Sequence, residues 1–75
     1  MIPYKNLSGN SGISHYQTGT DFIRVKFKGN HTVYTYSNLV TGKRYVDEMK
    51  RRAEKGIGLG TYISQNEQVK KNFST

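Results

Sequence analysis

The stretch Phe22–Tyr36, FIRVKFKGNHTVYTY, carries the strongest pattern in this chain of 75 residues. Apolar and cationic side chains alternate over residues 22–28, and this period of two is typical of a strand with one buried face. Gly29-Asn30 fits a two-residue turn, and residues 32–36 are rich in the β-branched and aromatic side chains that strands favour. The stretch therefore predicts a β-hairpin.

The position of the turn decides which way two tyrosines point. A turn at Gly29-Asn30 gives two cross-strand pairs on one face: Val25 with Tyr34, and Ile23 with Tyr36. A slip of one residue would turn both tyrosines to the cationic face, where their rings would stack on nucleobases. We favour packing in the core, because this register buries the rings and the chain has few aliphatic side chains.

The other elements complete a small α+β domain. Ile13–Tyr16 is a short first strand, and residues 41–55 form a helix with Thr41 as N-cap and Gly56 beyond its last residue. One face of this helix is apolar, with Tyr45, Val46, Met49 and Ala53. We expect a three-stranded antiparallel sheet covered by this one helix, and a short C-terminal helix from about residue 65 to 73.

The composition also suggests where the domain begins. Residues 1–12 hold the only proline together with two glycines and two serines, which predicts a flexible N-terminal arm. The single domain then covers residues 13–73. Within it, residues 56–60, GIGLG, form a mobile connector, and Tyr62-Ile63 is a short extended segment.

A net charge of +7 favours polyanionic partners, namely nucleic acid or an acidic protein surface. One group of cations forms a row without any acid on the exposed face of the central strand: Arg24, Lys26 and Lys28. A second group lies on the predicted helix and the tail: Arg44, Arg51, Lys55, Lys70 and Lys71. All of them are candidate phosphate contacts. The alternative is a solvated face with ion pairs, which the neighbouring acids favour for the helix: Asp47, Glu48 and Glu54.

Several classes of site find no support in the residues. The chain has no cysteine, and its two histidines, His15 and His31, have no carboxylate at ligand spacing, so we expect no metal site. No arrangement of nucleophile, base and acid suggests catalysis, and we expect neither an enzyme nor a cofactor. Residues 56–60 lack the spacing of a phosphate loop, although the amides of Gly58, Leu59 and Gly60 could form an anion nest. No apolar run is long enough for a signal peptide or a membrane span, so we expect a cytoplasmic protein without a membrane partner.

An ordered set of motifs runs from residue 11 to residue 73. Its members are Ser11-x-Ile13, Tyr16, Ile23-x-Val25-x-Phe27, Gly29, Tyr34-x-Tyr36, Val40, Ala53-Glu54-Lys55-Gly56, Tyr62-Ile63, Val69 and Phe73. In this order they resemble the KTSC domain, a small module named for its place at the C-terminus of some lysyl-tRNA synthetases and also found alone in short bacterial and phage proteins. Thr41-Gly42 departs from the family, which usually has a proline soon after the valine. The resemblance implies a three-stranded sheet covered by a helix, supplies no catalytic residues, and suggests RNA through the association with a synthetase.

The sequence thus supports two hypotheses about function. The first is a non-catalytic nucleic-acid-binding module, with RNA favoured over DNA, that uses the cationic strand face and the helix. The alternative is a protein-interaction module of a small phage or mobile-element protein that docks on a host factor.

Overall fold

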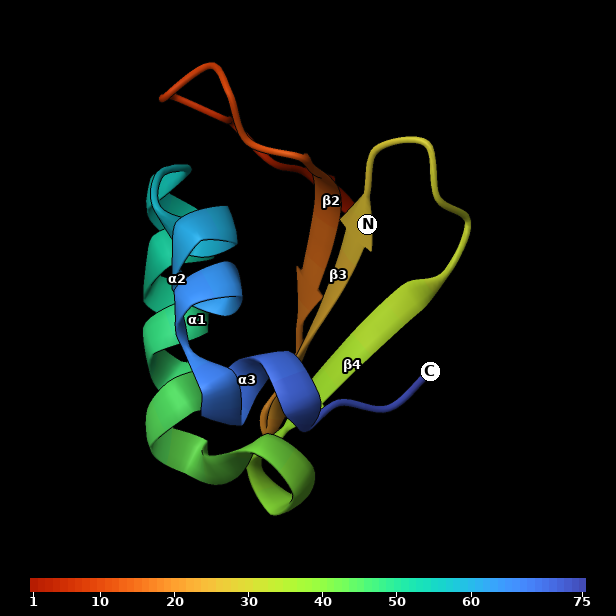
Figure 1. The fold of residues 1–75 in the computed structure, drawn as a ribbon, viewed down its shortest axis with the longest axis vertical. Coiled ribbons are helices and arrows are strands. Elements are labelled where there is room, and N and C mark those ends of the chain that lie inside the picture. The colour runs from red at the N-terminus through yellow and green to blue at the C-terminus, as the bar shows by residue number, and fades with distance from the viewer.

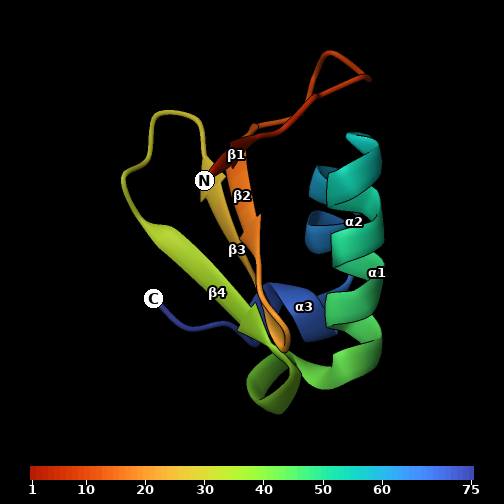
Figure 2. The same ribbon diagram turned by 180° about the vertical axis from the view of Figure 1, so that it is seen from behind.

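The computed structural model describes residues 1–75 as one antiparallel sheet with helices on one of its faces (Figure 1). The elements in chain order are β1 (Ile2–Pro3), β2 (Ile13–Thr18), β3 (Phe22–Phe27), β4 (Val33–Ser37), a π-helical turn η1 (Asn38–Gly42), α1 (Lys43–Lys55), α2 (Leu59–Gln65) and α3 (Glu67–Lys71). The strands lie in the order β1-β2-β3-β4, each antiparallel to its neighbour. Figure 2 shows the same arrangement from behind, with the helix layer on one side and the other sheet face uncovered.

The predicted hairpin register is confirmed, because Val25 pairs with Tyr34 and Ile23 pairs with Tyr36. The tip is wider than predicted, since β3 ends at Phe27 and residues 28–32 connect it to β4. The amide of Asn30 donates to the carbonyl of Phe27 at 3.3 Å, and Gly29 takes a φ of 72° inside this turn. Glycine at the third position of the turn meets its need for positive φ, while the register of the strands stays the same.

The core lies between the sheet and the helices. Its sheet side includes Ile23, Val25 and Tyr36, and its helix side consists of Val46, Met49, Ala53, Leu59, Ile63 and Val69. Tyr36 is only 2% exposed. Tyr34 is half-buried, with its ring edge-on to Phe27 at 5.5 Å and to Phe73 at 5.0 Å between centroids. Both tyrosines therefore point toward the helix side of the sheet, away from the cationic face.

The strand count of three was wrong, because the sheet has a fourth strand. β1 comes from the segment that its composition had assigned to a flexible arm, and it pairs with β2. Tyr4, next to β1, is buried with its ring edge-on to Tyr16 at 6.5 Å, and its hydroxyl accepts a hydrogen bond from the amide of Leu59 at 3.3 Å. Proline and glycine weaken a local strand signal, but burial of one aromatic ring orders the segment.

The helices also differ from the prediction in number and extent. Part of the predicted connector and all of the predicted extended segment belong to α2, so the chain has three helices where the sequence predicted one helix and a short C-terminal helix. The predicted C-terminal helix is α3, which is shorter than the expected range of about 65 to 73. α1 begins at Lys43, because Thr41 is buried and its hydroxyl donates to the carbonyl of Asn72. Gly56 follows α1 with a φ of 79°, as predicted. None of these helices has the length and the apolar content that crossing a membrane requires.

The buried phenol of Tyr36 makes stability depend on pH. Burial raises the pKa of Tyr36 to about 12, and the nearby Tyr34 adds to the shift. An unfolded phenol titrates near ~10, so between pH ~10 and ~12 the unfolded chain binds fewer protons than the folded one, and the free energy of unfolding falls as the pH rises. The contribution is complete below pH ~10. We expect Tyr36→Phe to remove a decrease of about 2–3 kcal/mol across this interval.

Urea denaturation of both proteins, followed by circular dichroism from pH ~9 to ~12, measures this difference. The raised pKa of Tyr62 is present in both proteins and cancels in the comparison. Parallel stability curves for the wild type and Tyr36→Phe would contradict the prediction.

Candidate nucleic-acid interface

The sheet face opposite the helices is uncovered, and we call it the open face. Cross-strand pairing and the alternation along each strand place nine residues on it: Pro3, His15, Gln17, Phe22, Arg24, Lys26, Val33, Thr35 and Ser37. Across the strands, Lys26 lies between His15 and Val33, and Arg24 lies between Gln17 and Thr35. No aspartate or glutamate is among the nine.

The cations of this face are positioned by β3. Arg24 is exposed and Lys26 is half-buried, and both follow from the strict alternation of a central strand whose other face is in the core. Lys28 lies one residue beyond β3, in the loop of residues 28–32, where it is exposed. It follows Arg24 and Lys26 in sequence, just past the end of the strand. None of the three forms an ion pair. The four ion pairs of the molecule all lie within helices.

The helix cations face the other side of the molecule. Arg44, Arg51 and Lys55 project within a narrow arc of α1, opposite the buried Val46, Met49 and Ala53. Because the buried residues pack against the sheet, these three cations point away from it. The sequence analysis had treated both groups as phosphate contacts, whereas the structure places them on opposite sides of the domain.

Part of the helix charge is also neutralised locally. Arg51 donates to Glu48 through Nε at 3.0 Å and through Nη2 at 2.6 Å, and Arg52 donates to the same carboxylate at 2.7 Å. These hydrogen bonds lower the pKa of Glu48 to about 2, and those that Arg51 donates to Glu48 raise the pKa of Arg51. Lys71 pairs with Glu67 at 3.5 Å.

Three helix-side cations remain exposed without an ion pair: Arg44, Lys55 and Lys70.

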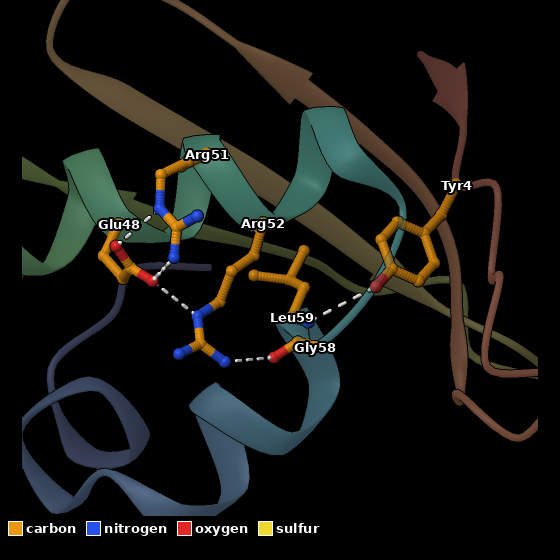
Figure 3. Close-up of polar contacts among 6 residues, drawn as sticks. All are labelled: Tyr4, Glu48, Arg51, Arg52, Gly58 and Leu59. Atoms are coloured by element: carbon orange, nitrogen blue, oxygen red, sulfur yellow. Dashed lines mark hydrogen bonds and ion pairs between the residues drawn. The ribbon is translucent and has the colours of Figure 1, made fainter.

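The glycine-rich segment 56–60 serves the fold. Arg52 Nη1 donates to the carbonyl of Gly58 at 3.0 Å (Figure 3). The guanidinium carbon of Arg52 also lies 4.7 Å from the ring centroid of Tyr62. The amide of Leu59 already donates to the hydroxyl of Tyr4, so the anion nest suggested by the sequence lacks its central amide. Arg52 thus connects α1 to the start of α2. The guanidinium of Arg52 and the amide of Leu59 both make contacts inside the molecule.

A polar cleft of about 310 Å³ lies between residues 8–12 and α2. Its lining is formed by Ser8, Asn10, Ser11, Gly12, Phe27, Gly58, Gly60, Thr61 and Ser64. The lining contains no charged side chain. No three His, Asp, Glu or Cys side chains come together in a way that could hold a metal ion.

Sequence reasoning did not place Phe22 or His15 on the open face. Phe22 has the same parity along β3 as Arg24, so the alternation alone could have placed its ring among the cations. His15 depends on an irregularity of register between Ile13 and His15, where the pairing of β2 with β3 shifts by one residue. A bulge of this kind leaves no clear signal in the sequence.

Comparisons of the chain with models of known families, with curated proteins and with solved structures give no match.

Proposed function

We propose that the chain is a non-catalytic nucleic-acid-binding module, with RNA favoured over DNA, whose interface is the open face. The observation that carries the proposal is the row of Arg24, Lys26 and Lys28. None of these cations has a carboxylate partner, whereas each of the four ion pairs of the molecule joins two residues of one helix. Cations without a carboxylate partner on an uncovered sheet face are available to phosphates. The resemblance to the KTSC domain and its association with a synthetase add support for RNA, and the cytoplasm is the compartment we propose.

The row supplies affinity in a simple way. Every second residue of a strand stands about 6.6–6.8 Å from the next one on the same face, so Arg24 and Lys26 follow a nucleic-acid backbone laid along β3, and Lys28 adjoins them in the loop. Each phosphate that a cation neutralises releases counterions, which makes the affinity depend on salt. Arg24 offers a planar fork and the two lysines act as point charges. Contacts of this type set the position of the strand and carry no sequence information.

A filter-binding titration with single-stranded RNA, and with DNA of the same sequence, at several salt concentrations tests the proposal. Three phosphate contacts predict a slope of about −2 for the logarithm of the association constant against the logarithm of the salt concentration. RNA should bind at least as tightly as DNA. An affinity no better than millimolar, or a slope near zero, would remove nucleic acid as the ligand.

One observation favours the second hypothesis, a protein-interaction module. Leu39 is 94% exposed in η1 and the adjacent Val40 is 42% exposed, so two neighbouring apolar side chains are open to a protein partner. If a host factor covers these side chains, a protein partner purified with the wild type from nuclease-treated lysate should be lost with Leu39→Ser. It should be kept when Lys26 is replaced by alanine.

A further inference from the structure

The open face carries one aromatic ring in a fixed position, that of Phe22. The amide of Gly19 donates to the carbonyl of Phe22 at 2.9 Å, and any side chain at Gly19 would overlap the ring, since an added Cβ would lie 2.1 Å from it. Lys50 of α1 donates through Nζ to the carbonyls of Gly19 at 2.6 Å and Thr20 at 3.1 Å. Lys50 thereby ties the turn between β2 and β3 to the helix layer, and the ring of Phe22 packs against Gly19 of this turn.

Arg24 lies over this ring. Its guanidinium carbon is 4.7 Å from the centroid of Phe22, and its Nη1 is 3.4 Å from Oε1 of Gln17. The ring and the glutamine thus orient the guanidinium, which is exposed and has no carboxylate partner. The result is a flat, charged surface two residues from Lys26 in the same row.

A flat guanidinium on an aromatic ring recognises a particular form of nucleic acid. Bases stack on aromatic rings and on arginine planes, but only unpaired bases expose their faces for stacking. In a duplex the base faces are stacked on one another, so only the phosphates can contact the open face. We infer that the open face takes a single strand in preference to a duplex, with one base stacked on the pair of Phe22 and Arg24 and the adjoining phosphates at Lys26 and Lys28. This inference rests on the proposed function and specifies the form of the ligand.

Two substitutions separate stacking from charge. Arg24→Lys keeps the charge and removes the plane, and Phe22→Leu keeps an apolar side chain and removes the ring. The matched control is Lys26→Ala, which removes a phosphate contact and no stacking group. Circular dichroism and thermal unfolding of each variant confirm its fold before binding is measured.

Fluorescence anisotropy with a labelled RNA oligonucleotide, single-stranded or annealed to its complement, is the measurement. We expect the wild type to bind the single strand about 5-fold or more tighter than the duplex, and we expect Arg24→Lys and Phe22→Leu each to lose about 5-fold or more on the single strand only. Their salt slopes should equal that of the wild type. Lys26→Ala should weaken both forms to a similar degree and reduce the single-strand slope by about 0.7.

Equal affinity of the wild type for single strand and duplex would overturn the inference, and so would unchanged single-strand binding by both stacking variants. In either case salt-dependent binding would leave the proposed function standing. If neither form bound with an affinity that falls as salt rises, the proposed function itself would be overturned, and a protein ligand would take its place.

Discussion

Replacing Arg24, Lys26 and Lys28 together by glutamine should lower the affinity for single-stranded RNA about 100-fold at roughly 0.1 M salt. Each phosphate contact on a single strand contributes about 0.7 logarithmic units at this salt concentration, and three contacts sum to about two. Glutamine is uncharged but keeps a long polar side chain, so the strand should remain intact. Titrations at several salt concentrations give both the affinity and the slope, which should fall close to zero.

The chain offers a matched control on its other side. Arg44, Lys55 and Lys70 are exposed without ion pairs, and their replacement by glutamine removes the same charge from the helix layer. If the open face is the interface, this triple variant should lose no more than about 3-fold through the general field of the protein. Equal losses in the two variants would show that net charge alone attracts the RNA and that no particular face binds it.

The second large effect concerns stability. Tyr4→Ala should lower the free energy of unfolding by about 3–5 kcal/mol, as large-to-small changes of buried aromatic residues do. Tyr4 is 7% exposed, packs on Tyr16, and satisfies the amide of Leu59, which the alanine variant would leave without its partner. Because a chain of this length has a total stability of only about 4–11 kcal/mol, much of the variant would be unfolded at room temperature or on mild heating.

Thermal and urea denaturation measure this loss, with Leu7→Ala as the control. Leu7 belongs to the same segment but is 65% exposed, so its replacement should change stability by no more than about 0.5 kcal/mol. Tyr4→Phe should fall between the two, because it loses only the hydrogen bond to Leu59. Should Tyr4→Ala be as mild as Leu7→Ala, residues 1–12 would be the flexible arm that their composition predicts.

The hairpin could be predicted because its signals are local. The alternation over residues 22–27 predicts which side of β3 is buried. The position of Gly29 predicts the register of β4 on β3, even though the loop is longer than a two-residue turn. The end of α1 at Gly56 was predictable for the same reason, since a left-handed residue there favours glycine. The cationic row of the open face followed from these local rules, and Phe22 would have followed from them as well.

Other features depended on contacts between residues far apart in the chain. Tyr4 orders β1 by bonding to Leu59, and Thr41 is buried through its bond to Asn72, so neither β1 nor the start of α1 could be placed from neighbouring residues. The same holds for the separation of the two groups of cations. Their distance in sequence carries no information about which side of the domain each one faces, because that depends on how α1 packs on the sheet.

The sequence by itself determined that a central strand has one apolar and one cationic face, since side chains alternate on any strand whatever surrounds it. Only the tertiary structure decided that the helices cover the apolar face with their own cations turned outward, and that a fixed ring and an unpaired guanidinium meet on the uncovered face. The physical reason is that an apolar face is buried only by packing against another element, as the sheet does here against the helices. Each apolar face needs a partner, and the choice of partner leaves the remaining surface free to bind.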